Sequence, residues 1–69
     1  MNLEKFDENK IINIKFYDGQ EIKGKPYGYT SEQDNDEGAY LLVIPIEGKL
    51  KGKYVQCMED EVVNVEVIE

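Results

Sequence analysis

A run of alternating apolar and polar residues that ends at Asp18-Gly19 constrains the fold of this chain more than any other feature. Between residues 11 and 17 every second side chain is large and apolar, which is the period of a strand with one buried face and one wet face. Asp18-Gly19 suits a tight turn, so the chain can reverse and pair residues 20–23 with the first strand. The stretch from Ile11 to Gly24 therefore predicts a hairpin, with these residues in its buried layer: Ile12, Ile14, Phe16 and Ile22.

The second strand of this hairpin is interrupted soon after it starts. Gly24 and Gly28 favour a bulge or a sharp bend, and Pro26 between them cannot donate a hydrogen bond to a ladder. Tyr27 and Tyr29 stand two residues apart beyond the bend. We therefore expect the two tyrosines to share one face.

Three further strands are expected in the rest of the chain. Among residues 39–46 both the odd-numbered and the even-numbered side chains are apolar, which is typical of a central strand covered on both sides. Residues 54–58 form a short strand, and the last segment alternates, with Val63, Val65 and Val67 facing inward. The connecting segments are an acidic solvated loop at 30–38, a hairpin loop at 47–53 and an acidic break at 59–61.

The N-terminal residues 1–10 admit two interpretations. Leu3 and Phe6 are three apart among charged residues, as in one or two turns of helix laid over the end of a barrel. The alternative is a frayed tail, because so short a helix is marginal without tertiary contacts.

Length limits the architecture to one domain, residues 1–69, which buries roughly 60% of its extended-chain surface. Five short strands in such a chain favour a closed or nearly closed barrel, because closure removes the exposed edges of a small sheet. The predicted fold class is all-β, a five-stranded small barrel with or without a short N-terminal helix.

The hairpin also carries a family resemblance. The pattern Ile12-x-Ile14-x-Phe16-x-Asp18-Gly19-x-x-Ile22-x-Gly24 resembles the first signature of the Sm-like (Lsm) proteins. The resemblance implies a five-stranded barrel that opens with a strand, an Asp-Gly turn and a bent, glycine-containing second strand, usually after an N-terminal helix. The acidic break before the terminal apolar strand is similar to the way those barrels close.

The RNA site that the resemblance would imply is matched at one position. The aromatic residue is present as Tyr29, but Thr30 and a lengthened acidic loop follow where the family has residues that help to hold a base. The last turn has Glu59, Asp60 and Glu61 in place of a basic residue and a glycine, so negative charge stands where RNA phosphates would lie.

Charge sets the expected partners. The chain has 15 acidic side chains, 8 lysines and no arginine, for a net charge of −7. Phosphate backbones are bound by basic surfaces, so this charge disfavours nucleic acid. Polar residues follow Met1 and no apolar run is long enough to span a bilayer, so we expect a cytoplasmic protein without a membrane partner.

Catalysis is not expected. The chain has no histidine, and its one cysteine, Cys57, is followed by acids that would raise the thiol pKa. We interpret Cys57 as a small buried hydrophobe. Asp34, Asp36 and Glu37 could gather a calcium ion, but their spacing does not fit a twelve-residue calcium loop, so no metal or cofactor is predicted.

Two candidate binding surfaces remain. Tyrosines beside the acidic loop suit contact with a protein, because they combine an apolar body with a hydroxyl; the candidates are Tyr27, Tyr29, Asp34, Asp36 and Tyr40. Lys49, Lys51 and Lys53 would share one face of an extended hairpin and form a basic patch with Lys23 and Lys25. The alternative is a solubilising loop that protects a sheet edge.

These features predict a small acidic, non-enzymatic module that binds a protein partner or a further copy of itself. One alternative is an Sm-like RNA-binding ring. A further alternative is an acidic inhibitor whose carboxylates imitate the phosphates of a nucleic acid.

Overall fold

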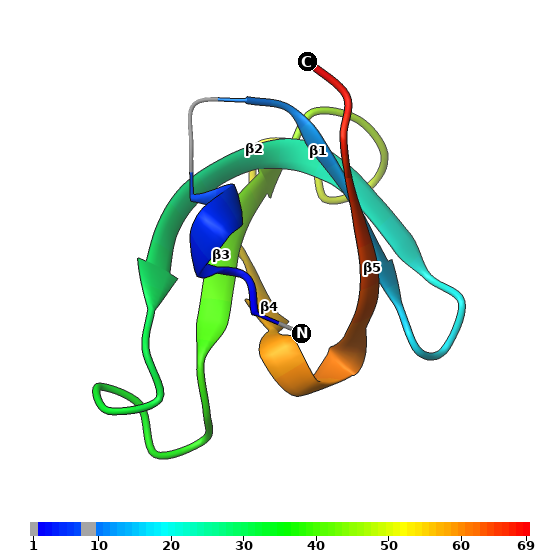
Figure 1. Ribbon diagram of the computed structural model, residues 1–69. Coiled ribbons are helices and arrows are strands. Elements are labelled where there is room, and N and C mark those ends of the chain that lie inside the picture. Colours follow the sequence, from blue (N-terminus) through cyan, green and yellow to red (C-terminus); the bar gives the residue numbers. More distant parts are fainter. Residues whose placement is uncertain (1, 8–9) are drawn as a thin grey trace.

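Five antiparallel strands form one sheet in the order β4-β3-β2-β1-β5 in the computed structural model, which describes residues 2–7 and 10–69 (Figure 1). The strands are β1 (Ile12–Phe16), β2 (Glu21–Thr30), β3 (Tyr40–Pro45), β4 (Val55–Met58) and β5 (Val62–Val67). Two short 3₁₀ helices accompany them, η1 (Glu4–Phe6) and η2 (Glu59–Glu61). The all-β, five-stranded part of the prediction is confirmed.

The predicted hairpin is present, and Ile22 packs against the core as predicted. Ile14 pairs with Ile22, and the turn is closed by the Phe16 N–H, which donates to the carbonyl oxygen of Gln20 at 2.8 Å. The Gln20 N–H donates to the Asp18 carboxylate at 3.0 Å, so the aspartate helps to hold the turn.

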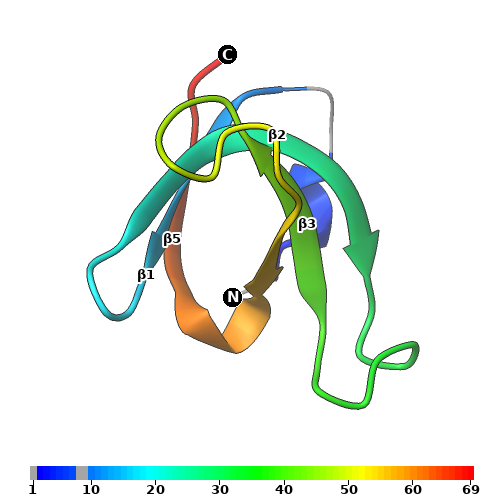
Figure 2. The ribbon, with the colours of Figure 1, turned by 180° about the vertical axis from the view of Figure 1, so that it is seen from behind.

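The sheet curls without closing. β2 is ten residues long and arches over the molecule, pairing with β1 along its first half and with β3 along its second half (Figures 1 and 2). Within the described residues no ladder joins β4 to β5, and the three residues of η2 connect these two strands. The closed form of the predicted barrel is therefore wrong for this chain, and β4 and β5 are the two edges of the sheet.

Two bulges change which side chains face inward. The β2–β3 register shifts between Pro26 and Gly28, so Tyr29 lies opposite the buried Leu41 and faces the core while Tyr27 stays exposed. The prediction that Tyr27 and Tyr29 share one face is wrong, because the extra residue of the bulge reverses the alternation.

A second register shift, between β1 and β5, affects Val63. Phe16 pairs with Val62 and Lys15 with Asn64, which leaves Val63 without a partner across the ladder. Val62 is 5% exposed and Val63 is 52% exposed. The inward position predicted for Val63 is therefore taken by Val62, and Val65 packs against the core as predicted.

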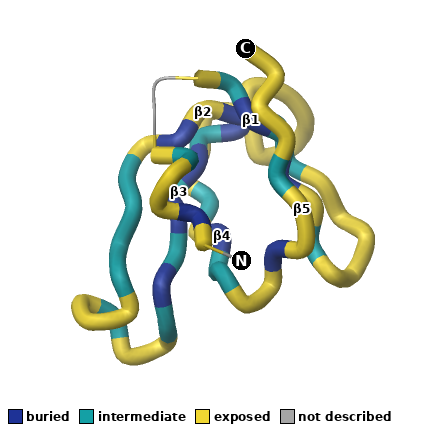
Figure 3. The backbone as a smooth tube through the Cα atoms, in the orientation of Figure 1, coloured by how far each residue is buried: buried dark blue, intermediate teal, exposed yellow. Residues whose placement is uncertain are grey.

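The strands of the curled sheet share one hydrophobic core, and their buried residues are dark blue in Figure 3. Its buried members come from the N-terminal segment and from all strands except β2, and they are Leu3, Ile12, Ile14, Leu41, Val43, Cys57 and Val62. Leu3 precedes η1, which lies in front of β3 in the view of Figure 1. One turn of 3₁₀ helix is thus present, within the one or two helical turns considered for residues 1–10, of which residues 1, 8 and 9 lie outside the described part.

β3 has one buried face and one half-exposed face. Leu41, Val43 and Pro45 are buried, whereas Tyr40, Leu42 and Ile44 on the other side are partly exposed. No helix or strand among residues 2–7 and 10–69 forms a second layer over that side. The prediction of a strand covered on both sides is therefore wrong for the isolated chain, and an apolar surface is left on the outside.

Candidate protein-interaction surface

The outer side of β2, β3 and β4 carries an apolar surface that we call the tyrosine face. The ladder pairs Tyr40 with Met58 and Leu42 with Gln56, and the residues between them on each strand are the buried Leu41 and Cys57. Alternation along the strands therefore directs Tyr40, Leu42 and Met58 outward. The apolar residues of the tyrosine face are Tyr27, Tyr40, Leu42, Ile44, Tyr54 and Met58.

Two exposed tyrosines meet on this face. The rings of Tyr27 and Tyr54 are in edge-to-face contact, with centroids 5.2 Å apart and planes at 67°. Tyr27 is 63% exposed and Tyr54 is 62% exposed. Tyr27 belongs to β2 and Tyr54 precedes β4, so the rings approach each other across β3. Edge-to-face packing restrains both rings at little further cost, which prepares them to contact a partner.

Tyr29, which was predicted to bind a partner, makes its contacts within the chain. Its hydroxyl donates a hydrogen bond to the carboxylate of Glu59 at 3.0 Å, and the same oxygen accepts the Leu3 N–H at 2.7 Å. Desolvation, followed by the hydrogen bond to Glu59, raises the pKa of the Tyr29 hydroxyl. Tyr29 therefore ties η2 to β2, and through Glu59 to the N-terminal segment, and is not part of the tyrosine face.

The acidic loop between β2 and β3 lies at one end of the tyrosine face. Met58 is close to this loop, since a Cβ placed on Gly38 would be 3.8 Å from its methyl carbon. Asp34 and Asp36 are both exposed, and Asp34 accepts a hydrogen bond from the Ser31 hydroxyl at 3.3 Å. In the described part of the chain, no three acidic or cysteine side chains come together as a metal site.

The lysine loop between β3 and β4 is coiled. Its N–H groups at Lys51 and Lys53 donate to the carbonyls of Gly48 and Leu50, and Gly48 and Gly52 both have positive φ. The extended hairpin that would place Lys49, Lys51 and Lys53 on one face is therefore wrong, because these turns remove the two-residue alternation. The three lysines are all exposed.

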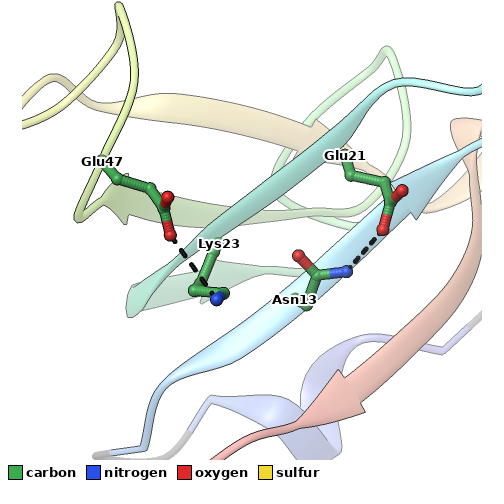
Figure 4. A network of polar contacts seen from close by, with 4 residues as sticks. All are labelled: Asn13, Glu21, Lys23 and Glu47. Carbon is green, nitrogen blue, oxygen red and sulfur yellow. Dashed lines mark hydrogen bonds and ion pairs between the residues drawn. The ribbon is translucent and has the colours of Figure 1, made fainter.

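An open depression of about 650 Å³ lies between this loop and the start of β2. Its polar groups are paired with each other: the Lys23 ammonium is 3.5 Å from the Glu47 carboxylate, and the Asn13 amide donates to Glu21 at 2.8 Å (Figure 4). Charges of both signs satisfied in this way do not converge on a ligand, so the depression is a weaker candidate site than the tyrosine face.

Cys57 has no geometry for nucleophilic chemistry. Its side chain is fully buried, as predicted. Desolvation, with a smaller contribution from Glu61, raises the pKa of the thiol to about 12. The thiol therefore stays protonated at neutral pH, and Cys57 serves as a core residue opposite Leu41.

Sequence reasoning found Tyr27 and Tyr40 but missed four members of the face. Leu42 and Ile44 belong to the second of the two apolar sides of residues 39–46. That side was expected to be buried like the first. Tyr54 and Met58 are an odd number of residues from Cys57, so on a strand they face the opposite side of the sheet. They could have been assigned to the outer side once Cys57 was placed in the core. The ring contact between Tyr27 and Tyr54 depends on the bulge in β2, which the sequence does not locate to one residue.

No helix in the described ranges is long and apolar enough to cross a membrane. Comparison of the chain with protein-family models, with curated proteins and with solved structures gives no match.

Proposed function

We propose that this chain is a small, acidic, non-enzymatic binding module that contacts a protein partner through the tyrosine face. The observation that carries the proposal is the pair of exposed, mutually packed rings of Tyr27 and Tyr54 above a partly exposed β3. Exposed apolar patches on small proteins mark interaction sites, and tyrosines contribute strongly to binding because they bury a large area with few rotatable bonds.

The test is affinity capture with the tagged chain from an extract of its source cells, quantified by mass spectrometry. The double variant Tyr27→Ala/Tyr54→Ala should lose at least about tenfold of the captured partner, because truncating a central aromatic costs about 2 kcal/mol or more. Tyr17→Ala is the matched control, since Tyr17 is 67% exposed but lies in the β1–β2 turn.

A partner that is retained by the double variant, or lost equally with Tyr17→Ala, would refute the tyrosine face as the binding site. Circular dichroism and urea unfolding of each variant show whether the fold is intact. Fluorescence titration with short RNA tests the nucleic-acid alternative, and RNA binding that falls steeply with salt would favour that alternative over a protein partner.

A second candidate function is self-assembly of an Sm-like barrel through its edges. The specific support is that the sheet is open and that β4 and β5 contain neither lysine nor proline, the residues that commonly protect edge strands. The strand order, with η2 between β4 and β5, is consistent with the Sm-like fold proposed from the hairpin. Light scattering on a sizing column should then give a discrete species of several subunits, and a monomer or dimer would refute it.

A further inference from the structure

We propose that the occupant of the tyrosine face is a second copy of this chain, which packs on it face to face across a two-fold axis. The inference rests on the proposed function and adds the identity of the partner. It depends on an observation separate from the exposed tyrosines, namely that charges of opposite sign gather at the two ends of this face.

The lysine end of the face lies where β4 begins. Lys25 pairs with Ile44 and is exposed, between the buried residues Gly24 and Pro26, so it shares the outer side of the sheet with Ile44. Lys53 is exposed and directly precedes Tyr54. The Ile46 N–H donates to the carbonyl of Lys23 at 3.0 Å, which holds the lysine loop against β2. This end holds five of the eight lysines, Lys23, Lys25, Lys49, Lys51 and Lys53, and the Glu47 carboxylate of the same loop pairs with one of them, Lys23.

The acidic end lies at the opposite ends of the same strands. The acidic loop joins β2 to β3 there, and η2 follows β4 there. The Glu59 N–H donates to the carbonyl of Ala39 at 3.0 Å, which brings the start of η2 beside the end of the loop. The acidic loop contributes four of the fifteen carboxylates to this end, Glu32, Asp34, Asp36 and Glu37, whereas Glu59 is turned inward to Tyr29 and the Leu3 N–H.

A two-fold axis that crosses the strands makes this face complementary to itself. Such an axis, lying between two stacked sheets, makes the strands of the copies run in opposite directions. The lysine end of each copy then lies over the acidic end of the other, and the apolar residues of both copies meet in the centre. The contact is isologous, so each favourable pair of ends occurs twice and the assembly stops at two subunits.

The net charge is compatible with this contact. Two chains of charge −7 repel each other at long range, but at physiological salt the screening length is about 8 Å. The attraction between opposite charges in direct contact is therefore retained, whereas most of the long-range repulsion between the two chains is screened.

Charge exchange tests the inference, with the dissociation constant measured by sedimentation equilibrium at physiological salt. One variant carries Lys25→Glu/Lys53→Glu and the other carries Asp34→Lys/Asp36→Lys. Each variant alone brings like charges together, so its self-association should weaken by about tenfold or more. An equimolar mixture of the two should recover the dimer, because both contacts of the mixed pair join opposite charges. Lys5→Glu/Lys15→Glu, which changes the charge equally on η1 and β1 and away from the lysine end, should leave the dimer unchanged.

The inference would be overturned if the wild-type chain were monomeric at about 100 μM, which is roughly the largest dissociation constant of a useful weak dimer. So would an oligomer that persists in both charge variants or whose mixture shows no recovery. In either case the capture experiment with Tyr27→Ala/Tyr54→Ala still decides whether the tyrosine face binds another protein. The result that would refute the dimer therefore differs from the result that would refute the tyrosine face as a protein-binding site.

Discussion

At the scale of single residues, the bend of β2 depends on the absence of a side chain at Gly24. A Cβ at this position would be 2.5 Å from the carbonyl oxygen of Ile44 and 2.8 Å from the Cα of Pro45. Both atoms belong to the backbone of β3, so neither can rotate away. The strand that carries Tyr27 is therefore brought close to β3 by a glycine at the start of their ladder.

We predict that Gly24→Ala destabilises the protein by about 1–3 kcal/mol, because β2 and β3 must separate to admit the methyl group. Urea unfolding followed by circular dichroism measures the loss. For a domain of this size each kcal/mol corresponds to a fall of about 4–8 °C in the melting temperature.

Gly28→Ala is the matched control on the same strand. No atom lies within 4 Å of a Cβ placed on Gly28, and its φ is not in the left-handed region. Alanine there restricts the unfolded chain without a clash, so it should stabilise by about 0.4–1 kcal/mol. Equal destabilisation by the two substitutions would show that close approach at Gly24 does not hold the bend.

At the scale of elements, the hairpin was predictable because local rules suffice for it. The alternation of Ile12, Ile14 and Phe16 and the Asp18-Gly19 turn act within a few residues, and the hairpin with Ile22 on its core side follows from them. The existence of the other three strands was predictable for the same reason. A bulge somewhere in residues 24–28 was also indicated by glycine and proline.

The positions of the bulges were not predictable, because they are set by the fit between strands distant in sequence. Their consequence is large, since one extra residue reverses every later side chain on the strand. This is why Tyr29 faces Glu59 and Val63 faces outward, against expectation. The candidate site was thus predicted in part: Tyr27 and Tyr40 belong to it, and Tyr29 does not.

The N-terminal segment shows the same limit. Its sequence could not decide between a helix and a frayed tail, because the group that holds it is 56 residues away. Glu59 accepts the Leu3 N–H, and Leu3 is fully buried at the end of the core. A single turn fixed by a long-range contact leaves no local periodicity for the sequence to display.

At the scale of the whole molecule, the excess of acid is concentrated at one end. Asp36 lies in the acidic loop, with Asp34 and Glu37 close by in sequence. Glu66 lies on β5, where it pairs with Asn13 of β1. The molecule is 30 Å along its longest axis. The screening length is about 30 Å at 0.01 M salt and about 8 Å at 0.15 M, so the salt concentration decides which charges interact.

We predict that Asp36→Asn and Glu66→Gln both raise the melting temperature by about 1–3 °C at 0.01 M NaCl, where every carboxylate is repelled by the whole net charge. At 0.15 M NaCl only Asp36→Asn should keep most of its effect, because its acidic neighbours remain within the screening length. Calorimetry on dilute, monomeric protein measures both values. If the two variants respond equally to salt, the charge acts as a uniform excess, and the electrostatic argument for two distinct ends of the tyrosine face is lost with it.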